Sequence, residues 1–367
     1  MPIISRNFEA MSIAKSTKKS VSELGDYTIR INLEFLKGCE FTCPGCYVNR
    51  SNDFTVDDLS MVEDAVTSFQ ESGFNFDEII LGPTDFFSAL NCDQVLKNAK
   101  FRSIFKSSDI TLILISTLQT KEEEIIRRIK LLNDSINSEC DIEFLIVFDL
   151  EKILSKDQDY IEEIKRKIKL LDNVKADVDY AFQINIRDIN GLENFNLLEL
   201  TSYVRDEFDT IVEFNPSFLR SSNEKNIHET LHKWNNLLAH NYSKIEAKDV
   251  KNVLFTMGNK NHASLSEVTY NYKNGTFYTC PFVYENIFNT GERFKINATG
   301  DNGRYKLSDF HDHRNRTTVE QLQYSEKTRE CSSCNHLLSC VGKQVLQFME
   351  EYKIKTCPLA KEVMDLY

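Results

Sequence analysis

The chain has 367 residues, a formal net charge of −12 and a hydrophobic content of 41%. That length exceeds one average domain, and the apolar content is enough for a large core. The acidic charge argues against a broad nucleic-acid surface, which would normally be basic. No apolar run approaches the length of a membrane span, and residues 1–19 lack the apolar stretch of a secretion signal. Ten cysteines without such a signal predict a reducing, cytoplasmic compartment, and metal binding or catalysis in place of disulfides.

Strand-like and helix-like segments alternate through the first two thirds of the chain. Continuous apolar strands that alternate with amphipathic helices imply a parallel α/β sheet with both faces covered. Apolar runs predict strands over residues 27–35, 78–81, 110–116, 141–148, 180–186 and 210–214. Helical periodicity predicts helices over residues 56–73, 93–105, 121–137, 158–171, 196–208 and 224–239. Six such units fit either a doubly wound open sheet or a partial barrel, and both place chemistry at the carboxyl ends of the strands.

The segment after the first predicted strand holds Cys39, Cys43 and Cys46, at the spacing C-x3-C-x2-C. Iron–sulfur clusters are normally held by four cysteines in closely spaced runs. Three thiolates would bind three irons of a [4Fe–4S] cluster and leave the fourth iron open to an outside ligand. Two alternatives remain: three buried core cysteines, or a zinc knuckle with a distant fourth ligand.

The three-cysteine motif resembles that of the radical S-adenosylmethionine (SAM) superfamily. The resemblance implies that residues 27–241 form a partial (β/α)6 TIM-like barrel. It also implies that the open iron binds the amino and carboxylate groups of SAM. One electron, delivered by a reducing partner such as flavodoxin or ferredoxin, would then release a 5'-deoxyadenosyl radical that abstracts a hydrogen atom.

The same resemblance indicates where SAM would bind. In the family, a Gly-Gly-Glu-like turn after the second strand holds the SAM amino group. Here Gly82, Thr84 and Asp85 occupy that place in the sequence Gly-Pro-Thr-Asp. Gly82 would allow a close backbone approach, and Asp85 would accept a hydrogen bond from the ammonium group. An ordinary strand-to-helix turn is the alternative.

Further residues are candidates for contact with SAM. Ser116 and Thr117 end the third predicted strand, and Asn185 and Arg187 lie on the fifth. Their position makes them candidates for contact with the ribose or the carboxylate, with purely structural roles as the alternative. The family usually has an aromatic residue before the last cluster cysteine, near the adenine. Here that position is Gly45, and Tyr47 follows the cysteine instead. Tyr47 is therefore the candidate substitute.

The composition changes after about residue 241, and residues 242–367 are predicted to form a second unit. An Asn-Gly pair at residues 274–275 predicts a two-residue hairpin turn. Further along, four cysteines follow the pattern C-x2-C-x5-C-gap-C. Four thiolates fit a closed [4Fe–4S] cluster or a structural zinc. These cysteines are Cys331, Cys334, Cys340 and Cys357.

That second pattern resembles the SPASM or twitch extension of radical SAM enzymes, a small α+β iron–sulfur domain that carries auxiliary clusters. Residues 275–280 (GTFYTC) match the G-x4-C part of it. Two of the four thiolates of the proximal auxiliary cluster are missing, because Gln344 replaces one and no cysteine precedes Gly275 at the expected distance. One auxiliary [4Fe–4S] cluster is therefore expected. Cys280 would be an unused relic, an alternative ligand or a hydrogen-atom donor.

The resemblance to SPASM enzymes implies modification of a peptide or protein, by a crosslink, an oxidation or an epimerisation. Residues 1–26, an N-terminal extension, are too short for a leader-binding domain, so recognition would need a separate leader-peptide-binding protein or a leaderless substrate. The alternatives are a radical SAM dehydrogenase of a small molecule and a non-catalytic zinc-binding module. A zinc protease is a third, because His228 and His232 stand in an H-E-x-x-H sequence.

Overall fold

The computed structural model describes most of the predicted sheet and the helices that connect its strands. The described residues are 28–41, 63, 76–106, 110–136, 140–186, 190, 192, 195–210, 212–215, 229, 233, 236–237, 240–241, 267–273, 276–278, 295–303, 305–306, 308–309 and 312. The predicted helix over residues 56–73 lies outside them except for residue 63, as does most of the helix over residues 224–239.

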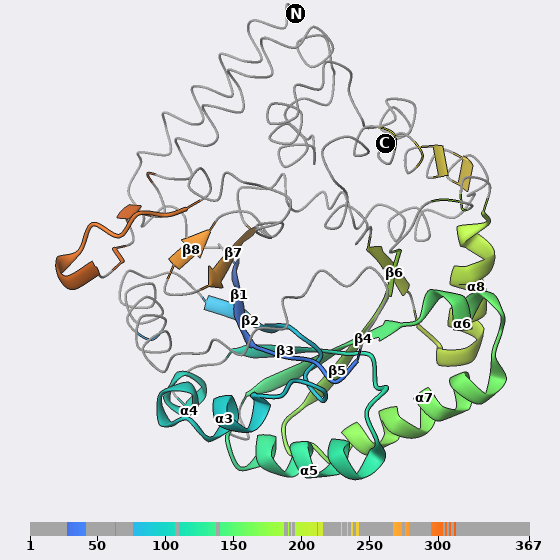
Figure 1. The fold of residues 1–367 in the computed structure, drawn as a ribbon, viewed down its shortest axis with the longest axis horizontal. Helices are drawn as coiled ribbons and strands as arrows, with labels where there is room; N and C mark the ends of the chain where they lie inside the picture. The colour runs from blue at the N-terminus through green and yellow to red at the C-terminus, as the bar shows by residue number, and fades with distance from the viewer. Residues whose placement is uncertain are drawn as a thin grey trace, which may run out of the picture.

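In the described part of the chain, eight strands form one sheet in the order β6-β5-β4-β3-β2-β1-β7-β8 (Figure 1). Strands β1 to β7 pair in parallel, and β8 pairs antiparallel to β7. All six strands predicted from apolar runs are confirmed, with small shifts at their ends. The bounds are β1 (Thr28–Leu36), β2 (Phe76–Pro83), β3 (Thr111–Ser116), β4 (Asp141–Phe148), β5 (Val178–Asn185), β6 (Val212–Asn215), β7 (Glu267–Lys273) and β8 (Thr276–Tyr278).

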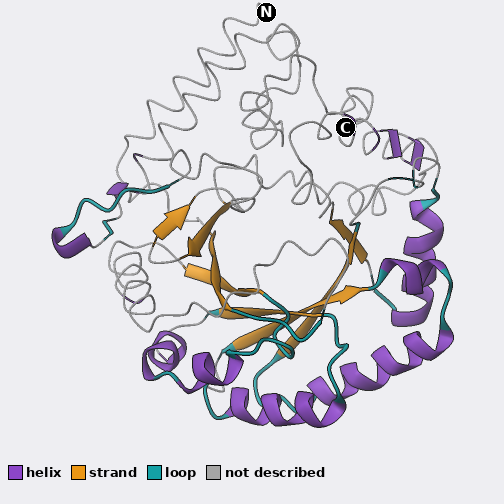
Figure 2. Cartoon of the chain, in the orientation of Figure 1, coloured by secondary structure: helices purple, strands orange, loops and turns teal. Residues whose placement is uncertain are grey.

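The first six strands follow one another across the sheet without a reversal of direction. A doubly wound sheet reverses at a switch point, so the strand order excludes that alternative for β1 to β6. Right-handed crossovers between strands that succeed one another in one direction place the connecting helices on the same face. Figure 2 shows α3, α5 and α7 along the outer side of the curved sheet. The described helices therefore cover one face, where the sequence pattern had predicted that both would be covered.

The helices agree with the sequence prediction with two exceptions: a short helix over residues 150–154 was not predicted, and the helix predicted over residues 93–105 is interrupted. The helices are α3 (Cys92–Lys97), α4 (Ala99–Lys106), α5 (Glu122–Asn133), α6 (Leu150–Leu154), α7 (Gln158–Leu171) and α8 (Leu197–Phe208), with a 3-10 turn η3 (Asp301–Gly303). Residues 93–105, predicted as a single helix, are helical except at Asn98, which is extended and ends α3. Its Oδ1 accepts a hydrogen bond from the backbone N–H of Lys100 at 2.9 Å. Asparagine competes in this way with the helical backbone.

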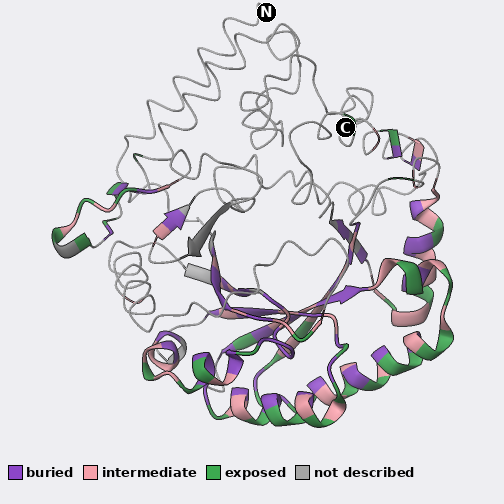
Figure 3. Cartoon of the chain, in the orientation of Figure 1, coloured by how far each residue is buried: buried purple, intermediate pink, exposed green. Residues whose placement is uncertain are grey.

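The main core lies between the sheet and its outer helices (Figure 3). Ile31, Leu33 and Phe35 alternate along β1 and are buried. Because side chains alternate between the two faces of a strand, Asn32 is directed to the opposite face. The same alternation places Gly82 of β2 on that face, since Ile79 and Leu81 belong to the core. Polar and small residues thus occur on the face of the sheet away from these helices.

The hairpin predicted at residues 274–275 is confirmed by the antiparallel pair Lys273↔Thr276. Its first strand, β7, continues the main sheet by pairing with β1, from Thr28↔Glu267 to Leu33↔Tyr272. The sheet therefore spans both sides of the predicted boundary between residues 241 and 242. Among the described residues, no helix has the length and apolar character needed to cross a membrane.

Candidate functional site

Chemistry-bearing residues gather at the carboxyl ends of β1, β2 and β3. Cys39 lies just beyond β1 and is partly exposed. Its Sγ lies 3.2 Å from Oγ of Ser88, and it accepts a hydrogen bond from the backbone N–H of Phe41 at 3.4 Å. The N–H of Phe41 and the hydroxyl of Ser88 are thus placed where both can donate to this sulfur.

The other members of the first cysteine motif, Cys43 and Cys46, lie outside the described residues, and so does Tyr47. The same is true of Cys280 and of the second cysteine set, Cys331, Cys334, Cys340 and Cys357. Within the described residues, no three His, Cys, Asp or Glu side chains form a group that would hold a metal ion. The metal ligands predicted from sequence therefore stay predictions.

Residues 84–91, here called the β2 loop, brace the end of β1. The hydroxyl of Thr84, only 1% exposed, donates to the carbonyl of Leu36 at 2.9 Å. The side-chain amide of Asn91 donates to the carbonyl of Phe35 at 2.8 Å and accepts from the N–H of Lys37 at 2.7 Å. Buried backbone groups need such partners, so these contacts hold the chain that leads to Cys39.

Two backbone contacts extend this bracing as far as the cysteine. The N–H of Leu90 donates to the carbonyl of Lys37 at 3.1 Å. Cys39 itself forms an isolated antiparallel bridge with Ala89. The β2 loop therefore lies beside the segment that carries Cys39. These contacts set the direction in which that segment leaves the sheet.

Asp85 ties the β2 loop to the end of β3. Its Oδ2 accepts hydrogen bonds from the N–H of Thr117, from Oγ1 of Thr117 at 2.8 Å and from Oγ of Ser116 at 3.2 Å. Its Oδ1 accepts from the N–H of Ser88 at 3.0 Å. Burial raises the pKa of Asp85, while the hydrogen bonds from Thr117, Ser116 and Ser88 act in the opposite direction.

A carboxylate offers about four acceptor positions, and four donors of its own protein meet Asp85. In this structure Asp85 is thus a residue that positions the turn. Its predicted role as an acceptor for the ammonium of SAM stays a prediction. Thr84 and Ser116 are likewise engaged within the protein, through Leu36 and Asp85.

The loop after β3 has a strained backbone where it meets Asp85. Leu118 has a φ of 52°, a left-handed conformation that costs a residue other than glycine about 1 kcal/mol or more. Its N–H donates to Oγ of Ser116 at 2.9 Å, and its carbonyl accepts from Nζ of Lys167 at 2.8 Å. These bonds, with the contact of Thr117 to Asp85, hold the strained turn in place.

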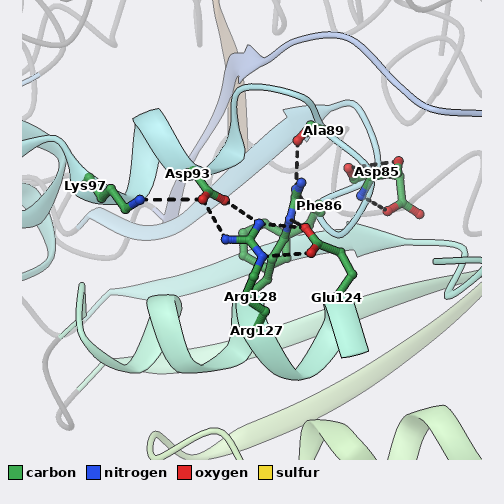
Figure 4. Close-up of polar contacts among 9 residues, drawn as sticks. Asp85, Phe86, Ala89, Asp93, Lys97, Glu124, Arg127 and Arg128 are labelled. Carbon is green, nitrogen blue, oxygen red and sulfur yellow. Dashed lines mark hydrogen bonds and ion pairs between the residues drawn. The ribbon is translucent and has the colours of Figure 1, made fainter. Parts of the chain in front are cut away.

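Arg128 of α5 supports the β2 loop from the helix side (Figure 4). Its side chain is 6% exposed, and Nη1 donates to the carbonyls of Phe86 at 2.9 Å and Ala89 at 2.8 Å. Its Nε pairs with Oε1 of Glu124 at 2.7 Å. The buried guanidinium group of Arg128 thus supplies hydrogen bonds to two carbonyl groups of the β2 loop.

Arg127, the next residue on the same helix, lies at the surface instead. It pairs with Asp93 of α3 at 2.6 Å and with Glu124 at 2.7 Å (Figure 4). Hydrogen bonds from Arg127 lower the pKa values of Asp93 and Glu124 below their usual range. This network joins α3 to α5 beneath the β2 loop.

Gly82 and Asn185 are the remaining described residues predicted to contact SAM, and they lie on strands that are not neighbours in the sheet. A Cβ atom at Gly82 would lie 3.4 Å from Oδ1 of Asn32 and 3.6 Å from Cδ1 of Ile115. The Oδ1 atoms of Asn32 and Asn185 are buried, and neither has a hydrogen-bond partner among the described residues. Asn185 ends β5, however, and β3 and β4 separate that strand from β2. The structure therefore brings Cys39, Thr84, Asp85 and Ser116 together and leaves Asn185 apart.

Cys92 and Cys140 are core residues. They are 0% and 1% exposed. Burial raises the pKa of Cys92 to about 12 and that of Cys140 to about 11. Neither thiol is therefore suited to nucleophilic chemistry at neutral pH. His228 and His232 lie outside the described residues.

Sequence reasoning missed Asn32, Ser88 and Arg128. Two of them leave a signal in the sequence. Asn32 is an uncharged polar residue between the buried Ile31 and Leu33 of β1, and Arg128 falls among the buried positions Ile125, Ile129 and Leu132 of α5. Ser88 leaves no such signal, because only the tertiary structure brings it to Cys39.

Comparisons with known proteins give a weak structural likeness. No family model and no curated protein sequence matches the chain. Two solved structures of SuiB from Streptococcus suis are similar to it. SuiB bound to the precursor peptide SuiA is 15% identical with a TM-score of 0.36, over 73% of this chain and 64% of SuiB. SuiB bound to S-adenosylmethionine is 14% identical with a TM-score of 0.45, over 92% of this chain and 79% of SuiB. In the first comparison the chain spans less than two thirds of SuiB, and neither TM-score reaches 0.5.

Proposed function

We propose that the chain is a radical SAM enzyme, which cleaves S-adenosylmethionine reductively and uses the resulting radical to abstract a hydrogen atom from its substrate. The observation that carries this proposal is the position of the cysteine motif. Cys39 lies beyond the carboxyl end of β1, at the sheet edge where α/β proteins place their chemistry. Cys43 and Cys46 follow it at the spacing C-x3-C-x2-C.

The proposed ligands of a [4Fe–4S] cluster are Cys39, Cys43 and Cys46. Such a cluster, when bound, supplies the single electron that breaks a carbon–sulfur bond of SAM, and a flavodoxin or ferredoxin would replenish it. The surroundings of Cys39 support the choice of this residue, because the N–H of Phe41 donates to its sulfur and the hydroxyl of Ser88 can also donate, while a metal-bound sulfur only accepts hydrogen bonds. The β2 loop would hold Cys39 in one position relative to β1 and β3.

The one-directional sheet β1 to β6 supports a partial (β/α)6 barrel as the radical SAM core. SAM is proposed to bind at the edge formed by β1, β2 and β3. Gly82 would allow its close approach, and the amide oxygen of Asn32 beside Gly82, which has no hydrogen-bond partner in the described part of the chain, would accept a hydrogen bond from it. Thr84, Asp85 and Ser116 would shape this edge, with Asn185 and Tyr47 as further contacts. These roles are proposals for mutational study.

The second cysteine set supports a peptide or protein as the substrate. Its spacing resembles that of the auxiliary-cluster domain of peptide-modifying enzymes, which we assign to residues 242–367. One auxiliary [4Fe–4S] cluster would be bound there. Its four ligands would be Cys331, Cys334, Cys340 and Cys357, with Cys280 as a candidate hydrogen donor.

The metal content of the protein tests this proposal. Protein purified and reconstituted without oxygen is expected to hold about eight irons and about eight sulfides per chain, as two [4Fe–4S] clusters require. Replacement of Cys39, Cys43 and Cys46 by alanine together should leave about four of each. Zinc in place of iron at both cysteine sets would reject the enzyme and favour the non-catalytic zinc-binding module.

A further inference from the structure

Ser88 is the residue of the β2 loop whose side chain meets the sulfur of Cys39. Its side chain is 0% exposed, and its Oγ lies 3.2 Å from Sγ of Cys39. The same Oγ lies 3.4 Å from the carbonyl oxygen of Asp85. A hydroxyl carries one hydrogen, so Ser88 has two acceptors for a single donor.

Iron binding by Cys39 would decide between these two acceptors. A thiol can donate its own hydrogen to Ser88, which leaves the hydroxyl free to donate to Asp85. A sulfur bound to iron has no hydrogen to donate, so Ser88 must be the donor in that contact. The hydroxyl hydrogen then points at the sulfur, which is nearer than the carbonyl by the two distances given.

The backbone that carries Ser88 is held in place by the rest of the protein. The N–H of Ser88 donates to Asp85, and the carbonyls of Phe86 and Ala89 on either side are held by Arg128. Asp85 is in turn held by Ser116 and Thr117. The backbone at Ser88 is thus held by two separate elements, the end of β3 and helix α5.

We propose that Ser88 is a positioning residue that donates a hydrogen bond to the cluster-bound sulfur of Cys39 and thereby raises the reduction potential of the cluster. This inference rests on the proposed function. Hydrogen bonds to the sulfurs are one of the factors that set the potential of an iron–sulfur cluster, because they stabilise its more negative, reduced state. Partners of this kind also orient the metal ligand itself.

The test compares the reconstituted wild-type protein with S88A in a redox titration followed by electron paramagnetic resonance. We expect S88A to keep its iron and to have a lower midpoint potential for the SAM-binding cluster. The matched control is S135A, because Ser135 is also buried but donates to the carbonyl of Leu131, far from the site in sequence. S135A should keep the wild-type potential.

A second measurement uses the wild-type protein and does not depend on the folding of S88A. After exchange into D2O, electron–nuclear double resonance of the reduced cluster should detect two exchangeable deuterons near the sulfur of Cys39, one from the N–H of Phe41 and one from the hydroxyl of Ser88. Absence of the second deuteron, or an equal potential in S88A and wild type, would overturn the role of Ser88 and leave the proposed function intact. A wild-type chain that binds no iron–sulfur cluster would overturn both.

Discussion

The carboxylate of Asp85 accepts hydrogen bonds from both the backbone N–H and the hydroxyl of Thr117, a residue on the far side of β3 in sequence. This pair joins the loop after β2 to the loop after β3. Asp85 also accepts a hydrogen bond from the N–H of Ser88, whose side chain contacts Cys39. The same carboxylate therefore connects the end of β3 to the contact between Ser88 and Cys39. The predictions below follow from this arrangement.

Substitution D85N is expected to lower the free energy of unfolding by about 2 kcal/mol. An amide presents one oxygen, so one set of buried donors loses its acceptor, at a cost of about 1–3 kcal/mol. Urea unfolding followed by circular dichroism measures the change. T117S keeps both donors to Asp85 and should stay within about 1 kcal/mol of wild type. Equal stability of D85N and wild type would contradict the positioning role of Asp85.

Substitution of the two neighbouring arginines of α5 should change the stability of the protein by very different amounts. R128M removes the donor to the carbonyls of Phe86 and Ala89 and should destabilise the protein by about 3 kcal/mol. R127M removes a surface pair and should cost at most about 1 kcal/mol. Because Ala89 bridges Cys39, R128M should also bind less iron after reconstitution. Similar losses of stability and iron in both variants would argue against the bracing role of Arg128.

The stabilising effect of Arg127 should depend on pH. Its hydrogen bonds lower the pKa values of Asp93 and Glu124. The stability that these carboxylates contribute is complete above their unfolded pKa values, about 4. It is lost as the pH falls through the lower values of the folded state. The difference in urea midpoint between wild type and R127M should therefore shrink from pH 6 toward pH 3. A difference that stays constant over this range would contradict the assigned pairing.

Cys92 and Cys140 should be inert thiols that play no part in cluster binding. Since burial raises their pKa values to about 12 and about 11, neither should be alkylated by iodoacetamide in the folded protein at pH 8. Peptide mapping by mass spectrometry would show labelling of both only after unfolding. C92A should keep the iron content of wild type, whereas C39A should lose about four irons per chain. Rapid labelling of Cys92 in the folded state would be inconsistent with its burial.

The strands could be predicted from sequence because burial alone dictates their apolar runs, as in Asp141–Phe148. The bounds of α7 were also correct, since Asp157 caps its first turn by accepting from the N–H of Tyr160. The break at Asn98 was missed because helical periodicity continues through it, while its side chain competes locally with the backbone. The contacts that build the β2 loop were also missed.

Those missed contacts share one physical cause. Ser88 meets Cys39 across 49 positions, and Arg128 meets Phe86 across 42. Such pairs depend on strand order and register, which local patterns do not encode. The carboxyl-end position of Cys39 was predictable from its place after an apolar strand, but the residues that hold it were not.

The cleavage of SAM tests the central claim most directly. Reconstituted protein would be mixed with dithionite and SAM in the absence of oxygen, and 5'-deoxyadenosine measured by liquid chromatography. The account predicts that 5'-deoxyadenosine forms with wild-type protein and not with C39A. Iron-loaded wild-type protein that forms none, under conditions in which its cluster is reduced, would contradict it.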